Sequence, residues 1–142
     1  MVKRNLAIAA TAVGLGLAAP AIAASQDEIN ATLSADTEIW QGLFALAVGD
    51  QIRTHCDSID VRTIRTTGFV YSLYNRARDY GYSRAEIRAF QTADSTEARM
   101  RAEVQAYFAL HGVREGAPET YCALGRSEIA SGTQAGELLR AR

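Results

Sequence analysis

The amino-acid sequence predicts an all-α fold, a compact bundle of five or six short helices with one disulfide. Apolar residues recur at helical spacing through most of the chain, and residues typical of helix ends separate these segments at short intervals. The alternation of apolar and polar residues that is typical of strands is missing. A parallel sheet or a barrel is therefore not expected, and the short connections favour a helical bundle.

The beginning of the chain has the pattern of a secretory signal peptide. Two basic residues precede a run rich in alanine, leucine and glycine, and Ala21–Ala23 has the small-x-small pattern that signal peptidase recognises. An uncleaved membrane anchor is the alternative, but the apolar run is short and its alanines and glycines insert weakly. We therefore expect residues 1–24 to be a signal peptide and residues 25–142 to form a single helical domain in the periplasm.

The expected exported domain is mildly acidic. Residues 25–142 contain thirteen arginines, no lysine and sixteen acids, which gives a net charge of −3. A domain of this charge lacks the basic surface that nucleic-acid binding requires, and no basic run suggests an anionic membrane surface. We expect no nucleic-acid partner and no direct membrane insertion after the signal is cleaved. The length is that of one domain that can hold a hydrophobic core.

The first helix is expected over about Thr37 to His55, where apolar residues recur at helical spacing. Asp36 or Thr37 is a suitable N-cap, because a short oxygen-bearing side chain can accept from the free amides of the first turn. Residues 25–35 are polar and are expected to form a loose lead-in.

The second helix is expected to begin near Ser58 or Asp60 and to end at Tyr80. Val70, Leu73, Tyr74 and Ala77 lie on one face by their spacing, and Val61 and Ile64 are expected to extend that apolar surface upstream. Gly81 then suits the left-handed position that ends a helix.

Two further helices follow in the middle of the chain. Ser83 and Glu86 have the spacing of a capping box and predict a short helix that carries Ile87 and Phe90. A cap around Asp94, Ser95 and Thr96 predicts a helix through Met100, Val104, Tyr107 and Phe108, which Gly112 ends.

The last two helices are marked by Pro118 and Gly132. Pro118 suits the first turn of a helix that holds Tyr121, Cys122, Leu124 and Ile129. Gly132 is expected to end that helix, and Thr133 to cap a final short helix with Leu138 and Leu139.

Cys56 and Cys122 are the only cysteines, and in an exported protein such a pair is most simply a disulfide. The rival interpretation is a catalytic thiol, which needs a base directed at the sulfur. His55 and Asp57 are poor candidates, since adjacent residues on a helix do not face each other. The chain has no Cys-x-x-Cys motif of the redox-active kind.

The histidines and acids form no recognisable catalytic or metal-binding motif. His55 and His111 could in principle bind a metal, but both are expected near helix ends, where a histidine interacts with free carbonyls. Asp57 and Asp60 could act as a general acid and base, but they fall where a helix is expected to begin and acids are favoured. We therefore expect no catalytic residues, no metal site and no cofactor.

The aromatic and arginine residues suggest a protein interface. Side chains of these types are enriched at the centres of protein–protein interfaces. The alternative is that the tyrosines pack at the edge of the core with their hydroxyls in water, and the sequence leaves this open. The candidate interface consists of Trp40, Arg62, Arg65, Tyr71, Tyr74, Tyr121 and Arg126.

Several stretches resemble a small family of exported alphaproteobacterial proteins that is catalogued as a domain of unknown function. They are Gly42–Phe44, Cys56–Ile59, Gly81–Ile87, Tyr121–Gln134 and Leu138–Arg140, and they extend over nearly all of the expected domain. The resemblance implies an exported helical domain with paired cysteines, and it brings no catalytic residues. It further implies an accessory subunit on the periplasmic face of an inner-membrane respiratory complex.

The functional expectation is a non-enzymatic periplasmic interaction protein with a protein partner, such as an envelope membrane complex that it stabilises as an accessory subunit. The alternative is a small periplasmic inhibitor or immunity-type protein that binds a secreted enzyme or toxin. A third class is an enzyme or ligand carrier. That class would require a deep pocket holding a titratable group with a strongly shifted pKa.

Overall fold

The computed structural model describes residues 22–142, and this part of the chain contains seven helices and one two-stranded sheet. The predicted helical bundle with one disulfide is confirmed in its main features, with more helices than expected and a small sheet. The predicted signal peptide falls mainly on residues 1–21, which lie outside the described residues. In chain order the elements are α1 (Gln26–Ala35), α2 (Thr37–His55), β1 (Ile59–Val61), α3 (Thr63–Asp79), α4 (Arg84–Gln91), α5 (Asp94–Leu110), α6 (Pro118–Ser131), α7 (Gln134–Leu138) and β2 (Leu139–Ala141).

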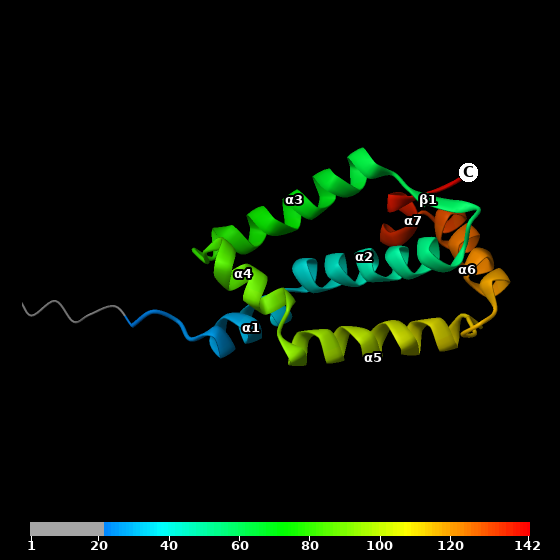
Figure 1. The fold of residues 1–142 in the computed structure, drawn as a ribbon. Helices are drawn as coiled ribbons and strands as arrows, with labels where there is room; N and C mark the ends of the chain where they lie inside the picture. The colour runs from blue at the N-terminus through cyan, green and yellow to red at the C-terminus, as the bar shows by residue number, and fades with distance from the viewer. Residues whose placement is uncertain (1–21) are drawn as a thin grey trace, which may run out of the picture.

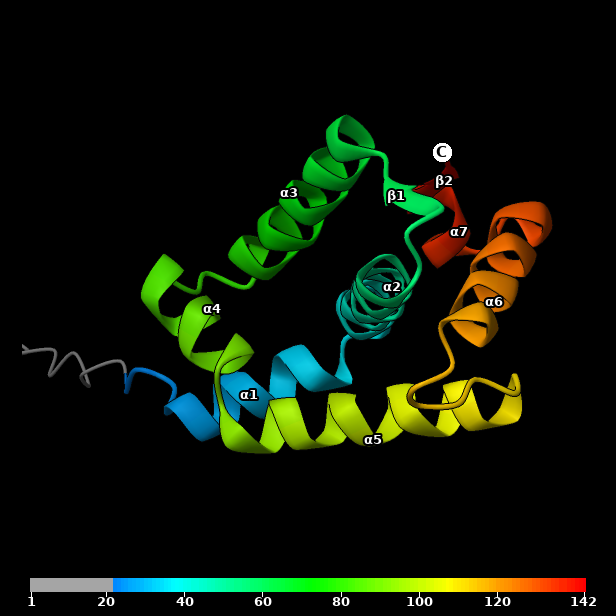
Figure 2. The same cartoon turned by 45° about the vertical axis from the view of Figure 1, so that its right-hand side comes forward.

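Helix α2 runs through the middle of the molecule (Figures 1 and 2). In both views α3 lies on one side of α2 and α5 on the other. The helix α4 joins them at the end where α2 begins, and α6 and α7 lie where α2 finishes. Helix α2 contacts α1, α3, α5, α6 and α7, so it is the element around which the others pack. None of the helices in the part described here is both long and apolar enough to cross a membrane.

The expected loose lead-in over residues 25–35 is wrong, because this segment forms the helix α1. The Ser25 side chain accepts from the Glu28 amide, and the Glu28 side chain accepts in return from the Ser25 amide. Ile29 and Leu33, one turn apart, are both buried. The capping box and this apolar pair together stabilise the helix.

The prediction for α2 is confirmed at both ends. The helix covers Thr37–His55, and Asp36 is its N-cap, with Oδ1 accepting from the Ile39 amide at 3.0 Å. The chain turns extended at Cys56, where the helix ends.

The prediction that a helix begins near Ser58 or Asp60 is wrong, because Ile59–Val61 form the strand β1. It pairs in antiparallel fashion with β2, and Asp60 lies opposite Arg140. Leu139, which was expected in the last helix, lies in β2 and pairs with Val61 of β1. The pairing gives the backbone of both segments hydrogen-bond partners that an isolated helix turn would not supply.

Helix α3 begins at Thr63, later than expected, and ends at Asp79. Gly81 has φ 87°, which confirms its role as the left-handed residue after the helix. The prediction for Ile64 is wrong, because its side chain is 92% exposed and does not extend the core.

The residues predicted to begin and end helices in the second half of the chain are confirmed, with one exception. Ser83 and Glu86 form the capping box of α4, and Pro118 lies in the first turn of α6. Gly132 is left-handed with φ 62°, and the Thr133 side chain caps α7. The exception is α5, whose N-cap is Ala93 without a side-chain hydrogen bond, so the cap expected around Asp94, Ser95 and Thr96 is wrong.

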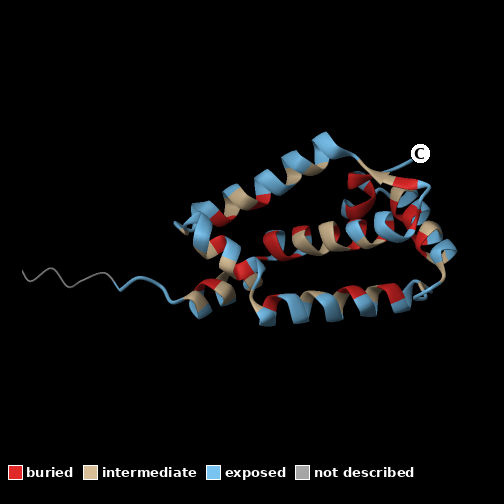
Figure 3. Cartoon of the chain, in the orientation of Figure 1, coloured by how far each residue is buried: buried red, intermediate tan, exposed pale blue. Residues whose placement is uncertain are grey.

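Two hydrophobic clusters lie along α2. The first lies near its beginning and the second covers the remainder up to the disulfide. Figure 3 shows buried residues at intervals along α2, whereas α3 is mostly exposed or half-buried. The first cluster contains Ile29, Leu33, Ile39, Trp40, Ala77, Ile87 and Phe90. The second contains Ala45, Val48, Ile52, Cys56, Ile59, Val104, Phe108, Tyr121, Leu124, Ala135 and Leu139.

The predicted disulfide is confirmed. Cys56 and Cys122 are bonded across a separation of 66 residues, and their Cα atoms are 5.1 Å apart. The bond connects the end of α2 to α6, inside the second cluster. It therefore fixes the end of the central helix against the C-terminal part of the chain.

Replacing both cysteines, Cys56→Ala with Cys122→Ala, should lower the free energy of unfolding by about 4 kcal/mol, because the unfolded chain regains the freedom of a long loop. Urea denaturation of the oxidised protein and of the variant measures the difference. A variant as stable as the wild-type protein would contradict the structural role of the bond.

Two glycines in helices should respond in opposite ways to alanine. A Cβ at Gly125 would collide with the side chains of Ile52 and Ile59, whereas a Cβ at Gly68 would meet no atom within 4 Å. Gly125→Ala should therefore lower the melting temperature, since overpacking a core costs about 1–3 kcal/mol. Gly68→Ala should raise it, because alanine favours a helix over glycine by about 1 kcal/mol. Equal shifts in the two variants would contradict close packing of α6 on α2.

Candidate functional site

The cysteines do not provide a nucleophile. Both sulfurs are committed to the disulfide, and no free thiol exists among residues 22–142. The Ser58 hydroxyl lies 3.2 Å from the sulfur of Cys56 and 3.7 Å from that of Cys122. The ring of His55 is stacked on Tyr121, with ring centroids 4.4 Å apart. The group of histidine, cysteine and aspartate in this segment is therefore part of the structural framework.

The two histidines lie at helix ends, as predicted. His55 Nδ1 donates to the carbonyl of Gln51 at 2.8 Å, and His111 Nδ1 donates to the carbonyl of Tyr107 at 2.7 Å. Each ring thus bonds to a backbone carbonyl in the last turn of its own helix. No group of three or more metal-ligating side chains comes together in the described range 22–142.

Asp57 and Asp60 do not begin a helix, so that expectation is wrong. Asp60 lies in β1, where its carboxylate is 3.5 Å from Arg140 and 3.7 Å from Arg142. The Val61 amide, and then these two arginines, lower the pKa of Asp60. This carboxylate therefore stays charged and fixes β2 beside β1.

The structure separates the residues of the candidate interface. Trp40 is buried, donates through Nε1 to Glu103 at 2.8 Å, and lies under the guanidinium of Arg99, 3.9 Å from the ring centre. Tyr121 is buried in the second cluster. These two aromatics therefore belong to the core, in agreement with the alternative interpretation of the aromatic residues.

The remaining five residues of the candidate interface lie at or near the surface. Tyr71 and Tyr74 are neighbours on α3, with ring centroids 6.3 Å apart. Arg62 donates to the carbonyl of Leu139, and Arg65 pairs with Glu137 at 3.6 Å. Arg126 is exposed on α6. Whether the exposed members bind a partner stays a prediction.

A buried ion pair at the start of α2 was not expected from the sequence. The Asp36 side chain is only 1% exposed and accepts from Arg76 Nε at 2.8 Å and from the Tyr80 hydroxyl at 2.6 Å. The Arg76 guanidinium is the main cause of a strongly lowered Asp36 pKa. Tyr80 and the Ile39 amide add to this effect, whereas burial opposes it. Asp36 thus caps α2 and ties α3 to it.

A second buried acid, Glu128, joins three helices at the opposite end of the molecule. It accepts from the hydroxyls of Tyr107 in α5 and Thr133 before α7. Burial, and then this contact with Glu128, raise the pKa of Tyr107 to about 12. Both buried acids are therefore engaged in bonds that hold the helices together.

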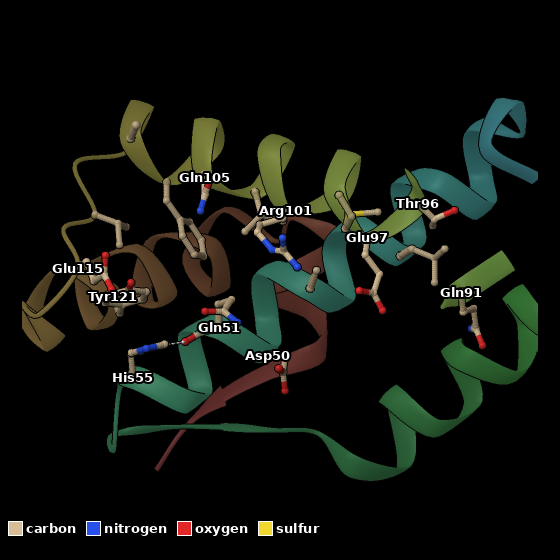
Figure 4. A pocket seen from close by; sticks show the side chains of 17 residues that line it. Asp50, Gln51, His55, Gln91, Thr96, Glu97, Arg101, Gln105, Glu115 and Tyr121 are labelled. Atoms are coloured by element: carbon tan, nitrogen blue, oxygen red, sulfur yellow. Dashed lines mark hydrogen bonds between the residues drawn. The ribbon is translucent and has the colours of Figure 1, made fainter. Parts of the chain in front are cut away.

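Two open grooves flank α2. The α2–α5 groove, of about 730 Å³, has apolar walls that include Leu43, Met100 and Phe108. In Figure 4, the side chain of Arg101 extends from α5 toward α2, and the polar groups are spread along the groove. Asp50, Glu97 and Glu115 line it together with Arg101, so this groove carries charges of both signs.

The α2–α3 groove is more apolar, and the charged residues that line its larger cavity are of one sign. It is formed by two cavities of about 570 Å³ and 430 Å³ that share Leu46 and Val70. The larger cavity has a mostly apolar wall, and its charged lining residues in the described chain are Arg84 and Arg88 of α4. Its lining includes Leu43, Leu46, Thr67, Val70, Leu73, Tyr74 and Ile87.

The rim of the α2–α3 groove leaves apolar side chains in water. Val70 is 44% exposed and Tyr71 is 63% exposed, and both point to the groove from α3. Ile64 shares their side of the helix, because it lies seven residues before Tyr71. Exposed apolar side chains that adjoin a groove are typical of interaction surfaces. The sequence could not identify this groove, since periodicity does not tell which apolar face stays uncovered.

Comparison with known proteins gives one match. The model of a family of unknown function, DUF5333, matches residues 31–140. No curated protein and no solved structure matches the chain.

The ion pair at the start of α2 predicts a pH dependence of stability. Because the pKa of Asp36 is lowered in the folded protein, its contribution is complete above about pH 4, the unfolded pKa, and decreases as the pH falls below it. Asp36→Asn should lower the free energy of unfolding at pH 7 by about 3 kcal/mol and flatten its fall below pH 4. Urea denaturation between pH 2 and 7, at about one-unit steps, measures both effects.

Glu38→Gln is the matched control for this experiment. Glu38 also pairs with Arg76 at 2.8 Å, but it is exposed, so its loss should cost less than about 1 kcal/mol. Equal losses in the two variants would contradict the assignment of the stabilisation to the buried carboxylate.

Proposed function

This chain belongs to the DUF5333 family of unknown function, and from that premise we propose that it is a non-enzymatic interaction protein of the periplasm. Its partner is a membrane complex of the envelope, such as a respiratory complex, which it stabilises as an accessory subunit. The observation that carries the proposal is the α2–α3 groove, an apolar channel with uncovered Val70 and Tyr71 on its rim.

The shape of the groove favours a helix as the bound element. On α3, Thr67, Val70, Tyr71 and Tyr74 line it at the spacing i, i+3, i+4, i+7, and α2 contributes Leu43 and Leu46, three residues apart. Two rows of this kind form ridges between which the side chains of a third helix can pack. The mode of recognition is thus an apolar helix face laid into a groove.

The length of the groove supports the same occupant. Its lining residues on α3 extend from Thr66 in the smaller cavity to Ala77 in the larger one. The eleven helical steps from Thr66 to Ala77 span about 16 Å, or three turns. A partner helix of three to four turns, a common length in proteins, would fill it.

The disulfide supports export. Bonds of this kind persist in oxidising compartments such as the bacterial periplasm and are rare in the cytosol. Cys56 and Cys122 are bonded, and the bond lies within the core cluster at the end of α2. A periplasmic location is therefore consistent with the chemistry of the folded domain.

A non-enzymatic role is supported by the way in which the reactive groups are used. Asp36, which has the most strongly shifted pKa of the acids, caps a helix and pairs with Arg76. Glu128 accepts from two hydroxyls of neighbouring helices. A carboxylate with a shifted pKa, such as Asp36, also arises in structural ion pairs, and the bonds of both acids connect helices.

A photoreactive residue in the groove should capture the partner. With p-benzoylphenylalanine in place of Val70 in the full chain, irradiation of intact cells should attach the protein to a subunit of an envelope membrane complex. Denaturing gels and mass spectrometry identify the attached segment. The matched control carries the same residue in place of Leu110, which is 84% exposed on α5 and lies outside both grooves.

Three outcomes would contradict the proposal. A groove position that gives no protein adduct, or the same adducts as the Leu110 position, would contradict binding in the groove. Specific capture of a soluble secreted enzyme would contradict the accessory-subunit role and favour the inhibitor or immunity-type alternative.

The exposed rim can be changed without harm to the fold. Val70→Glu with Tyr71→Glu should remove partner association, because charges replace the apolar contact, yet alter the free energy of unfolding by less than about 1 kcal/mol. Co-purification from solubilised envelope and urea denaturation measure the two effects. Leu110→Glu is the control and should change neither. Retained association in the double variant would contradict the proposed surface.

A further inference from the structure

We propose that the segment bound in the α2–α3 groove is an amphipathic helix with acidic residues at one end, held by Arg84 and Arg88. The inference rests on the proposed function and deepens it, because it states the chemistry of the partner. The observation that supports it is the pair of arginines, Arg84 and Arg88, that lines the groove beside α4.

Arg84 and Arg88 are placed one turn apart on α4, where they line the larger cavity. Within the described part of the chain, neither guanidinium takes part in a salt bridge or a side-chain hydrogen bond. By contrast, Arg53, Arg65, Arg76, Arg99, Arg114, Arg140 and Arg142 each have a carboxylate within 4 Å.

No acidic residue among those described lines the larger cavity. Arg84 and Arg88 are its charged lining residues, and Gln91 is the nearest polar neighbour on α4. Glu86, which lies between them in sequence, is bound to Ser83 through the capping box of α4. Two arginines at the end of an apolar groove thus present a positive site that a carboxylate can fill with paired hydrogen bonds.

The smaller cavity adds no unpaired charge among the described residues. The Thr66 hydroxyl oxygen is buried beneath its wall and has no hydrogen-bond partner within residues 22–142. Asp50 and Arg53, which also line this cavity, already pair with each other at 2.6 Å.

These contacts define a pattern that the bound segment should follow. One or two acids lie at the end beside α4, and apolar residues at i, i+3, i+4 and i+7 face Leu43, Leu46 and Val70. Arginines in this position select an acidic partner and exclude a basic one.

The test uses the segment that is recovered from the crosslink at position 70, made as a synthetic peptide. We expect this segment to contain the pattern of acids and apolar residues. Arg84→Glu with Arg88→Glu should lower the association rate of the peptide about tenfold, and raised salt should slow the wild-type protein toward the rate of the variant. Arg84→Lys with Arg88→Lys should retain most of the rate.

Two further variants serve as controls. Arg114→Glu, an exposed charge in the loop before α6 and outside the α2–α3 groove, should leave the rate unchanged. A peptide whose acids are replaced by arginine should recover binding to the Arg84→Glu, Arg88→Glu protein. Thr66→Val should raise the melting temperature of the free protein, because it removes a buried hydroxyl without a partner, and should leave the association rate unchanged.

The failure of this inference can be told from the failure of the proposed function. Capture of an envelope protein through a segment without acids, or an association rate that the charge reversal leaves unchanged, would overturn the inference alone. Crosslinks to phospholipid or to a second copy of the chain, or no specific adduct, would overturn both.

Discussion

The fold depends on a central helix whose two ends are fixed by different means. At the beginning of α2 the buried carboxylate of Asp36 accepts from the helix amide, from Arg76 of α3 and from Tyr80 directly after α3. At the other end the disulfide of Cys56 holds α6 against it. Each fixed end is surrounded by its own hydrophobic cluster, so the helix is anchored while its middle part keeps a free side.

The free side of α2 follows from how α3 is attached. The buried residues of helix α3 are Leu73 and Ala77, and the Leu73 side chain lies directly against Gly42 of α2. Beyond that approach the half-buried Leu46 belongs to neither hydrophobic cluster and lines both cavities of the groove. A domain this small has little apolar surface to spare, and leaving part of its central helix uncovered is costly unless another molecule covers it.

The sequence predicted local features well and distant ones poorly. Asp36 as the cap of α2, the capping box at Ser83, and Gly81 and Gly132 as helix ends were all correct, since each depends on neighbouring residues only. The helix α1 could have been found by the same rule, because Ser25 and Glu28 have the spacing of Ser83 and Glu86. The expectation of a loose segment gave too much weight to its polar composition.

What the sequence could not supply were contacts between distant segments. The strand pair joins Ile59 to Ala141, and three residues on each side are too few to show a pattern. The pairing of Asp36 with Arg76, forty residues away, has no local signal either. The sequence also did not show which side of each helix is buried. For this reason the candidate interface combined buried Trp40 and Tyr121 with exposed Tyr71.

The central claim is that the α2–α3 groove is covered by a partner in the cell. Hydroxyl-radical footprinting of intact cells and of the purified protein, read by mass spectrometry, tests it most directly. Tyr71, 63% exposed in the free domain, should be oxidised in the purified protein and protected in cells, whereas Leu110, 84% exposed and outside the groove, should react alike in both. Equal oxidation of Tyr71 in cells and in the purified protein would contradict the account.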